Sequence, residues 1–168
     1  MSEERSGMNV WRARFLTALI AVGAFLVPYG CATLIENALA QSWARYGFSP
    51  DQTREWWRHG FRSRATAIKW RASMFKPGEA ASWETNRFEP EEAKEWKKAG
   101  FDLAAAAEWR RYAFRHEEAG EWQATGMSVG DAVSWRKQGF RPGEAQRWKE
   151  AGHSPMNAAE RRAAGSSP

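Results

Sequence analysis

Tryptophan recurs at a fixed interval along this chain, and no other feature restricts the possible fold as strongly. Seven tryptophans follow one another at every thirteenth position: Trp70, Trp83, Trp96, Trp109, Trp122, Trp135 and Trp148. Trp43 and Trp56 are separated by the same interval, and one extra residue lengthens the interval from Trp56 to Trp70. Self-similarity at a fixed period is typical of proteins built from stacked repeats.

Three further positions repeat together with the tryptophan. A large side chain follows it five residues later, at Phe48, Phe61, Phe75, Phe88, Phe101, Phe114, Met127, Phe140 and, in the last unit, His153. Alanine usually lies three residues before it, at Ala80, Ala93, Ala106, Ala119, Ala132 and Ala145. Glycine usually lies four residues after it, at Gly47, Gly60, Gly100, Gly126, Gly139 and Gly152. Residues three apart share one helix face, so we interpret these tryptophans as a shared core rather than as exposed stacking platforms.

Each unit has the start and stop signals of a short helix. Pro142 suits the first helical position, Glu144 favours the positive helix end, and Gly152 supplies a left-handed residue that stops the helix. Good N-capping residues precede four of the helices, at Ser49, Asp102, Ser128 and Ser154. Three other units have poor caps in this slot, namely Lys76, Arg115 and Arg141. Three residues replace the stopping glycine, so we expect less regular turns at Met74, Arg87 and Ala113.

These signals predict an all-α fold, an array of about nine short helices from 13-residue Trp-centred repeats. A helix of about 10 residues is marginal alone in water, so neighbouring helices must stack and share their aromatic side chains. Short connections favour an antiparallel zigzag, and the architecture resembles α-solenoids in general. We assign residues 43–162 to the repeat domain, 36–42 to a junction and 163–168 to a disordered tail.

The N-terminal residues have the pattern of an export or anchor segment. Residues 1–14 form a basic n-region containing Arg12 and Arg14, and residues 15–35 form a hydrophobic segment long enough to span a bilayer as a helix. Three fates are open: signal cleavage after Ala40, lipidation of Cys31, or retention as a membrane anchor. The repeat register extends backward through Ala40 to Ile35, which adds some support to retention without deciding among the three. The basic flank predicts that the repeat domain lies outside the cytoplasm, exported or membrane-anchored.

Composition gives little support to catalysis. Cys31 is the only cysteine, and the three histidines, His59, His116 and His153, are far apart in sequence. The chain contains no Gly-rich phosphate loop, nucleophile elbow or zinc-binding helix motif. We therefore expect a protein that is not an enzyme, with no cofactor, no metal and no small-molecule substrate.

Two features of the repeats are candidates for contact with a partner. Basic residues recur just after the tryptophans, and in a stacked array they would form an anion-binding surface: Lys97, Lys98, Arg110, Arg111, Arg136 and Lys137. The plainer interpretation is a solvated surface, in which these cations complement helix ends and form pairs such as Glu95 with Lys98. Trp57 departs from the repeat, because it adjoins Trp56, and is the best candidate for an exposed contact.

The sequence thus favours a scaffold that mediates macromolecular interactions, with a protein or another macromolecule as its partner. The membrane would be a second partner if residues 15–35 are retained. The net charge of +5 leaves nucleic acid or anionic lipid open without favouring either. The alternatives are a cytoplasmic basic nucleic-acid-binding repeat protein and, less well supported, an enzyme with an unrecognised site.

Overall fold

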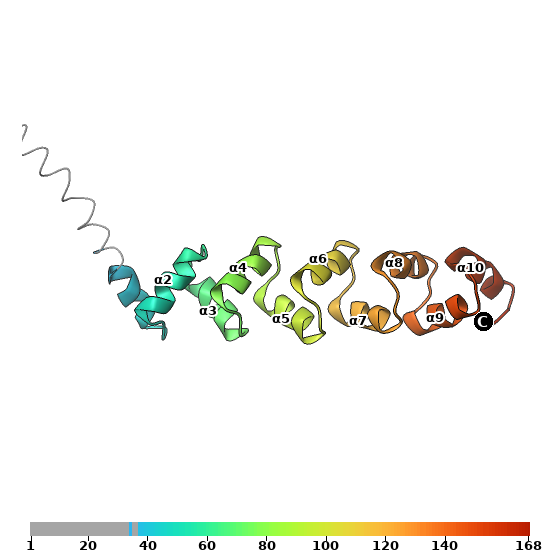
Figure 1. The fold of residues 1–168 in the computed structure, drawn as a ribbon, viewed down its shortest axis with the longest axis horizontal. Coiled ribbons are helices and arrows are strands. Elements are labelled where there is room, and N and C mark those ends of the chain that lie inside the picture. The colour runs from blue at the N-terminus through green and yellow to red at the C-terminus, as the bar shows by residue number, and fades with distance from the viewer. Residues whose placement is uncertain (1–33, 35–36) are drawn as a thin grey trace, which may run out of the picture. The chain divides into compact units, whose positions relative to one another are not determined.

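The computed structural model describes residue 34 and residues 37–168, and within these residues all regular secondary structure is helical (Figure 1). Residues 37–44 are helical. After them the described residues form α2 (Pro50–Arg58), α3 (Arg64–Ala72), α4 (Pro77–Thr85), α5 (Pro90–Lys98), α6 (Leu103–Arg111), α7 (His116–Ala124), α8 (Val129–Lys137), α9 (Pro142–Glu150) and α10 (Pro155–Ala163). The predicted all-α class and the Trp-centred recurrence are confirmed. The predicted segments 1–14 and 15–35 lie outside the described residues, apart from Leu34.

The chain forms two compact units, Met1–Ile68 and Lys69–Pro168. The described part of the first unit contains the helix at 37–44, α2 and the start of α3. The second unit contains the end of α3 and all of α4 to α10. Figure 1 shows that the helices of the second unit alternate between two rows, with α4, α6, α8 and α10 in one row and α5, α7 and α9 in the other.

The helices begin where the capping residues predict. Ser49 forms a capping box with Gln52, in which each side chain accepts a hydrogen bond from the other residue's backbone N–H, at 3.2 and 2.9 Å. The side chains of Asp102, Ser128 and Ser154 also accept cap hydrogen bonds. The three basic residues that were predicted to cap poorly make no side-chain cap bond: Lys76, Arg115 and Arg141. Local sequence therefore determines these helix starts.

The helix ends correct one prediction. Met74, Arg87 and Ala113 were expected to give irregular turns, yet they adopt φ of 70°, 61° and 58°, as the glycines of the other units do. Their turns are closed by the same bonds as the glycine turns, for example Phe88 N to Trp83 O at 3.1 Å. The buried aromatic that follows each turn holds the geometry, and its packing outweighs the ~1–2 kcal/mol cost of a left-handed side-chain-bearing residue.

The core consists of the repeated Trp, Phe and Ala positions, as predicted. In the unit around α5, Ala93, Trp96 and Phe101 are buried, with 0%, 1% and 3% of their surface exposed. The Phe101 ring packs edge-to-face against the Trp96 ring, with centroids 5.1 Å apart, and against the Trp109 ring of the next unit at 6.3 Å. This phenylalanine therefore joins two consecutive tryptophans, which is why one unit cannot form its core alone.

α10 departs from the repeat at its tryptophan position. Arg161 stands in α10 at the position of the missing tryptophan and is exposed, whereas Ala158 keeps the buried alanine position. The ring of His153 takes the aromatic position, 5.3 Å from the Trp148 ring. A hydrogen bond from Ser166 N to Arg161 O, 2.9 Å long, closes the turn after α10.

Candidate interaction surface

A guanidinium clamp ties three consecutive helices of the second unit together. Arg110, one residue after Trp109 in α6, lies 4.2 Å over the ring of Phe88 and donates hydrogen bonds to the carbonyls of Asn86 and Arg87 at 3.3 and 2.7 Å. These carbonyls lie at the C-terminal end of α4. The Arg110 Nε atom also pairs with Glu92 of α5 at 3.1 Å. The arginine thus caps one helix end and neutralises a carboxylate in the first turn of another.

The same clamp recurs in α8 and in α10, on every second helix after α6. Arg136 lies 3.5 Å over the ring of Phe114, pairs with Glu118 at 3.3 Å and donates to the carbonyls of Tyr112 and Ala113. Arg162 lies 3.9 Å over the ring of Phe140 and pairs with Glu144 at 3.2 Å. It also donates to the carbonyls of Gln138 and Gly139, at 2.8 and 3.3 Å.

Lysine occupies the equivalent position in the other row of helices. Lys97 of α5 pairs with Glu79 and lies 4.8 Å over the ring of Phe75. Lys149 of α9 pairs with Asp131 at 3.1 Å. The hydrogen bond from Lys149 is the main cause that lowers the pKa of Asp131, and partial burial opposes it. In α7, between these two, the position holds Gln123, and the matching acid position in α6 holds Ala105. The basic residue and its acidic partner are therefore both missing between α6 and α7.

We call the residue directly after each tryptophan position the cation position, and the residue four before each tryptophan the acid position. Within the second unit, the cation position pairs with the acid position of the preceding helix at Lys97, Arg110, Arg136, Lys149 and Arg162. In α4 the cation position holds Glu84 instead. Partial burial, followed by repulsion from Glu89, raises the pKa of the Glu84 carboxyl.

These contacts divide the six predicted anion-binding residues into two groups. Lys97, Arg110 and Arg136 are engaged in the contacts described above. The remaining three, Lys98, Arg111 and Lys137, lie one residue further along and are not part of the clamps. Lys98 pairs with Glu95 at 3.7 Å, as predicted. The structure also separates these three, because α5, which carries Lys98, lies in a different row from α6 and α8 (Figure 1).

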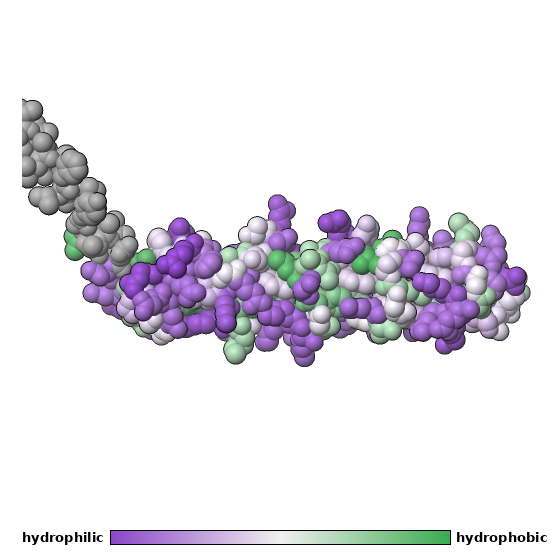
Figure 2. Space-filling view, in the orientation of Figure 1, coloured by the Kyte–Doolittle hydropathy of each residue, from purple (hydrophilic) through white to green (hydrophobic). Residues whose placement is uncertain are grey.

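Shallow grooves recur between neighbouring repeats of the second unit. One groove, of about 550 Å³, is lined by Glu79, Ser82, Trp83, Lys97, Gly100, Phe101, Asp102 and Leu103. A second, of about 330 Å³, is lined by Glu91, Glu92, Glu95, Trp96, Phe114, Arg115 and His116. Apart from Glu91, each residue of the second groove lies 13 positions after a residue of the first, so the two grooves are equivalent sites in neighbouring repeats. On the face shown in Figure 2, the second unit is mainly hydrophilic with small hydrophobic spots.

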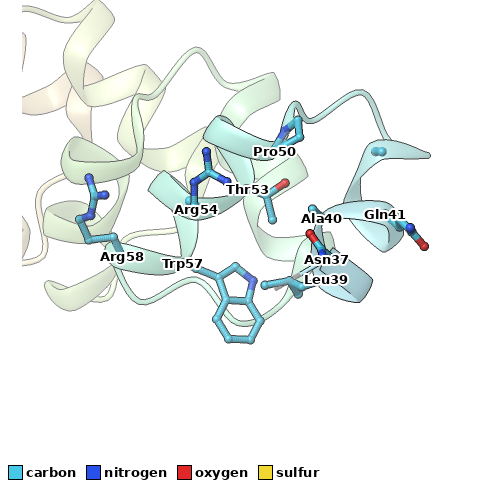
Figure 3. A pocket seen from close by; sticks show the side chains of 10 residues that line it. Asn37, Leu39, Ala40, Gln41, Pro50, Thr53, Arg54, Trp57 and Arg58 are labelled. Carbon is cyan, nitrogen blue, oxygen red and sulfur yellow. The ribbon is translucent and has the colours of Figure 1, made fainter. Parts of the chain in front are cut away.

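Trp57 lines a pocket of about 590 Å³ in the first unit, between α2 and the helix at 37–44 (Figure 3). Its side chain is half-buried, and the Arg62 guanidinium lies 4.6 Å over its ring. Figure 3 shows the indole beside Leu39, with Arg54 and Arg58 at the other side of the pocket. Sequence reasoning identified Trp57 by its departure from the repeat but did not predict that it would line a pocket.

Other predicted features receive no test from the described residues. Cys31 and nearly all of the segment 15–35 lie outside them. Within the part that is described, no helix is long and apolar enough to cross a membrane. In the same part, histidine, cysteine and acidic side chains form no group of three that could hold a metal ion.

Comparisons with protein-family models, with curated proteins and with solved structures find no match to this chain.

Proposed function

We propose that this chain is a non-enzymatic scaffold, an α-solenoid-like helical repeat that binds a macromolecular partner, with a protein as the first candidate, along successive repeats. The recurring groove carries the proposal. The same positions line it in neighbouring repeats, so a partner meets similar surfaces at regular intervals. Repeat proteins bind extended partners through such surfaces. The side chains that differ between grooves, such as Ser82 against Glu95, provide a means of discrimination.

The basic flank before residues 15–35 supports an exported or membrane-anchored scaffold whose repeats lie outside the cytoplasm. A reporter that is active only outside the cytoplasm, fused after Pro168, should give activity in the native host. Recovery of an inactive fusion from the cytosol would contradict the proposed location. Intact-mass measurement of the native protein then distinguishes cleavage after Ala40, a lipid on Cys31 and the retained segment.

Photo-crosslinking in the native host tests the grooves themselves. A photoreactive amino acid replaces Ser82 or Glu95, which line successive grooves one residue before their tryptophans. Glu160 is the matched control, because it holds the same position in α10 and lines neither groove. We expect the same discrete macromolecular adduct from both groove positions and none from Glu160. Equal labelling at all three positions, or no adduct from either groove, would contradict the proposal.

A nucleic-acid ligand is the main alternative, and it depends on the basic residues that the clamps leave aside. Reversing Lys98, Arg111 and Lys137 to glutamate leaves the core and the clamps untouched. If nucleic acid is the partner, wild-type affinity falls steeply with added salt, and the triple reversal abolishes binding while helical content is retained. We expect weak or no binding, because acidic side chains are interleaved with the basic ones along the array.

A further inference from the structure

An apolar pair stands in the first unit where the second unit has ion pairs. The acid position of the helix at 37–44 is Leu39, and the cation position of α2 is Trp57. Both residues line the pocket of about 590 Å³ (Figure 3). In the second unit, by contrast, ion pairs repeatedly join these two positions. The first unit therefore presents hydrophobic surface at a place where five junctions of the second unit present an ion pair.

The groups around this pocket favour an anionic, oxygen-rich ligand. Arg54 and Arg58 line the pocket and are exposed. Arg54 pairs with Asp51, whereas no ion pair of Arg58 is present in the part of the chain that the structure describes. The buried Nε1 atom of Trp57 also has no hydrogen-bond partner among the described residues. The two exposed arginines, and not this buried N–H, supply the donors for such a ligand.

The wider surface of the first unit has the same sign of charge. Residues 37–68 contain five arginines against two carboxylates, a net charge of +3. Two of these arginines lie over aromatic rings, Arg62 over Trp57 and Arg64 over Tyr46, at 4.6 and 4.2 Å. Tryptophan and tyrosine, with one apolar and one polar edge, are enriched at the membrane–water interface, and clustered basic residues are attracted to anionic lipid.

We propose that Leu39, Trp57, Arg54 and Arg58 form a docking surface for an anionic phospholipid membrane. Leu39 and the exposed part of the indole ring contact the apolar part of the interface, and the two guanidinium groups pair with lipid phosphates. In the sequence, this surface directly follows the hydrophobic residues 15–35. Lipid binding by the first unit does not depend on what the grooves of the second unit bind.

Vesicle binding by the full chain tests the charge requirement. Binding to phosphatidylcholine vesicles with about 30% phosphatidylglycerol is compared with binding to vesicles of phosphatidylcholine alone, and the difference is the charge-dependent part. Every variant contains residues 15–35, so their contribution is the same in each. Each basic side chain at an anionic surface strengthens binding about five-fold, so Arg54→Glu with Arg58→Glu should weaken the charge-dependent part at least about 25-fold. The control, Arg111→Glu with Lys137→Glu, changes the net charge equally and should weaken it less than about three-fold.

Quenching by lipids with brominated acyl chains tests contact by the indole. Wild-type emission should be quenched more than that of Trp57→Phe, because the other described repeat tryptophans are buried. Circular dichroism checks the fold, and Arg54→Gln with Arg58→Gln replaces the reversal if the latter unfolds. Equal weakening by reversal and control, or equal quenching of wild type and Trp57→Phe, overturns the proposal. Loss of nucleic-acid affinity with unchanged vesicle affinity in the reversal identifies nucleic acid as the ligand instead.

Discussion

Replacement of Arg136 by alanine removes several contacts of one guanidinium at once. The side chain lies 3.5 Å over the Phe114 ring, pairs with Glu118 at 3.3 Å and donates to the carbonyls of Tyr112 and Ala113. Two hydrogen bonds contribute about 1 kcal/mol each, the cation–π contact about 0.5–1 kcal/mol, and an ion pair that is one-third exposed about 0.5 kcal/mol. Because contributions at one site are not additive, we expect Arg136→Ala to lower the free energy of unfolding by about 2 kcal/mol.

Two further variants separate the parts of this loss. Arg136→Lys keeps a cation over the ring but cannot donate from two nitrogens to both carbonyls, so we expect a cost of about 1 kcal/mol. Lys137→Ala, one residue further along α8, removes a cation outside the clamp. Its cost should stay within about 0.5 kcal/mol. From most to least stable, we therefore expect Lys137→Ala, Arg136→Lys and Arg136→Ala.

Urea unfolding followed by far-ultraviolet circular dichroism measures these differences. A double-mutant cycle with Glu118→Gln isolates the ion pair, for which we expect a coupling of about 0.5 kcal/mol that decreases with added salt. If Arg136→Ala and Lys137→Ala cost the same, the clamp has no energetic role. The basic residues after the tryptophans would then be ordinary solvated cations.

Three further predictions follow from the core, the turns and an ion pair. Trp109→Ala should lower the free energy of unfolding by about 3–5 kcal/mol, because it leaves a cavity in the core. Trp57→Ala should lower it by about 1 kcal/mol, because that ring is half-buried. Equal losses would contradict the repeat register. Ala113→Gly should stabilise the chain by about 0.5–1 kcal/mol, because Ala113 has a φ of 58°, and a lower melting temperature would show that this turn is not strained. In the folded state the pKa of Asp131 lies below its usual value of 3.8, chiefly because of the hydrogen bond from Lys149. The pair therefore stabilises the folded chain above pH 3.8, and this stabilisation is lost as the pH falls through the folded-state pKa. Wild type should therefore exceed Asp131→Asn in stability at neutral pH and lose that advantage in acid, as denaturant titrations at several pH values would show.

The helices and the core could be predicted because their signals are local. A proline or capping residue, an alanine, a tryptophan and a glycine within a single repeat determine one helix and its buried face. Ser49 and Asp102 cap as expected for this reason. The turns at Arg87 and Ala113 were judged from the residue alone, and their regularity comes from the buried phenylalanines that follow them.

The clamps could not be predicted from one unit, because their partners belong to three helices. Arg136 reaches an acid in the preceding helix and a ring that comes before that helix, and these contacts arise only when alternate helices lie in one row. Glu118 also lies in the first turn of its own helix, α7, where a carboxylate favours the positive helix end. One carboxylate can interact with the dipole of its own helix and with a guanidinium of the next helix. Only the first of these interactions can be predicted from a single repeat.

The arginine clamps have a longer period than the core. One row holds Arg110, Arg136 and Arg162, which are spaced two repeats apart. The corresponding positions of the other row hold Lys97, Gln123 and Lys149. The core recurs in every repeat because each helix from α3 to α9 buries an Ala and a Trp at the same positions. The arginine clamps recur in every second repeat, on helices that share a row, whereas the grooves recur in neighbouring repeats. A partner that contacts one row therefore meets equivalent side chains once per helix pair, and the pair of helices is the unit with which a binding surface on this chain should be compared.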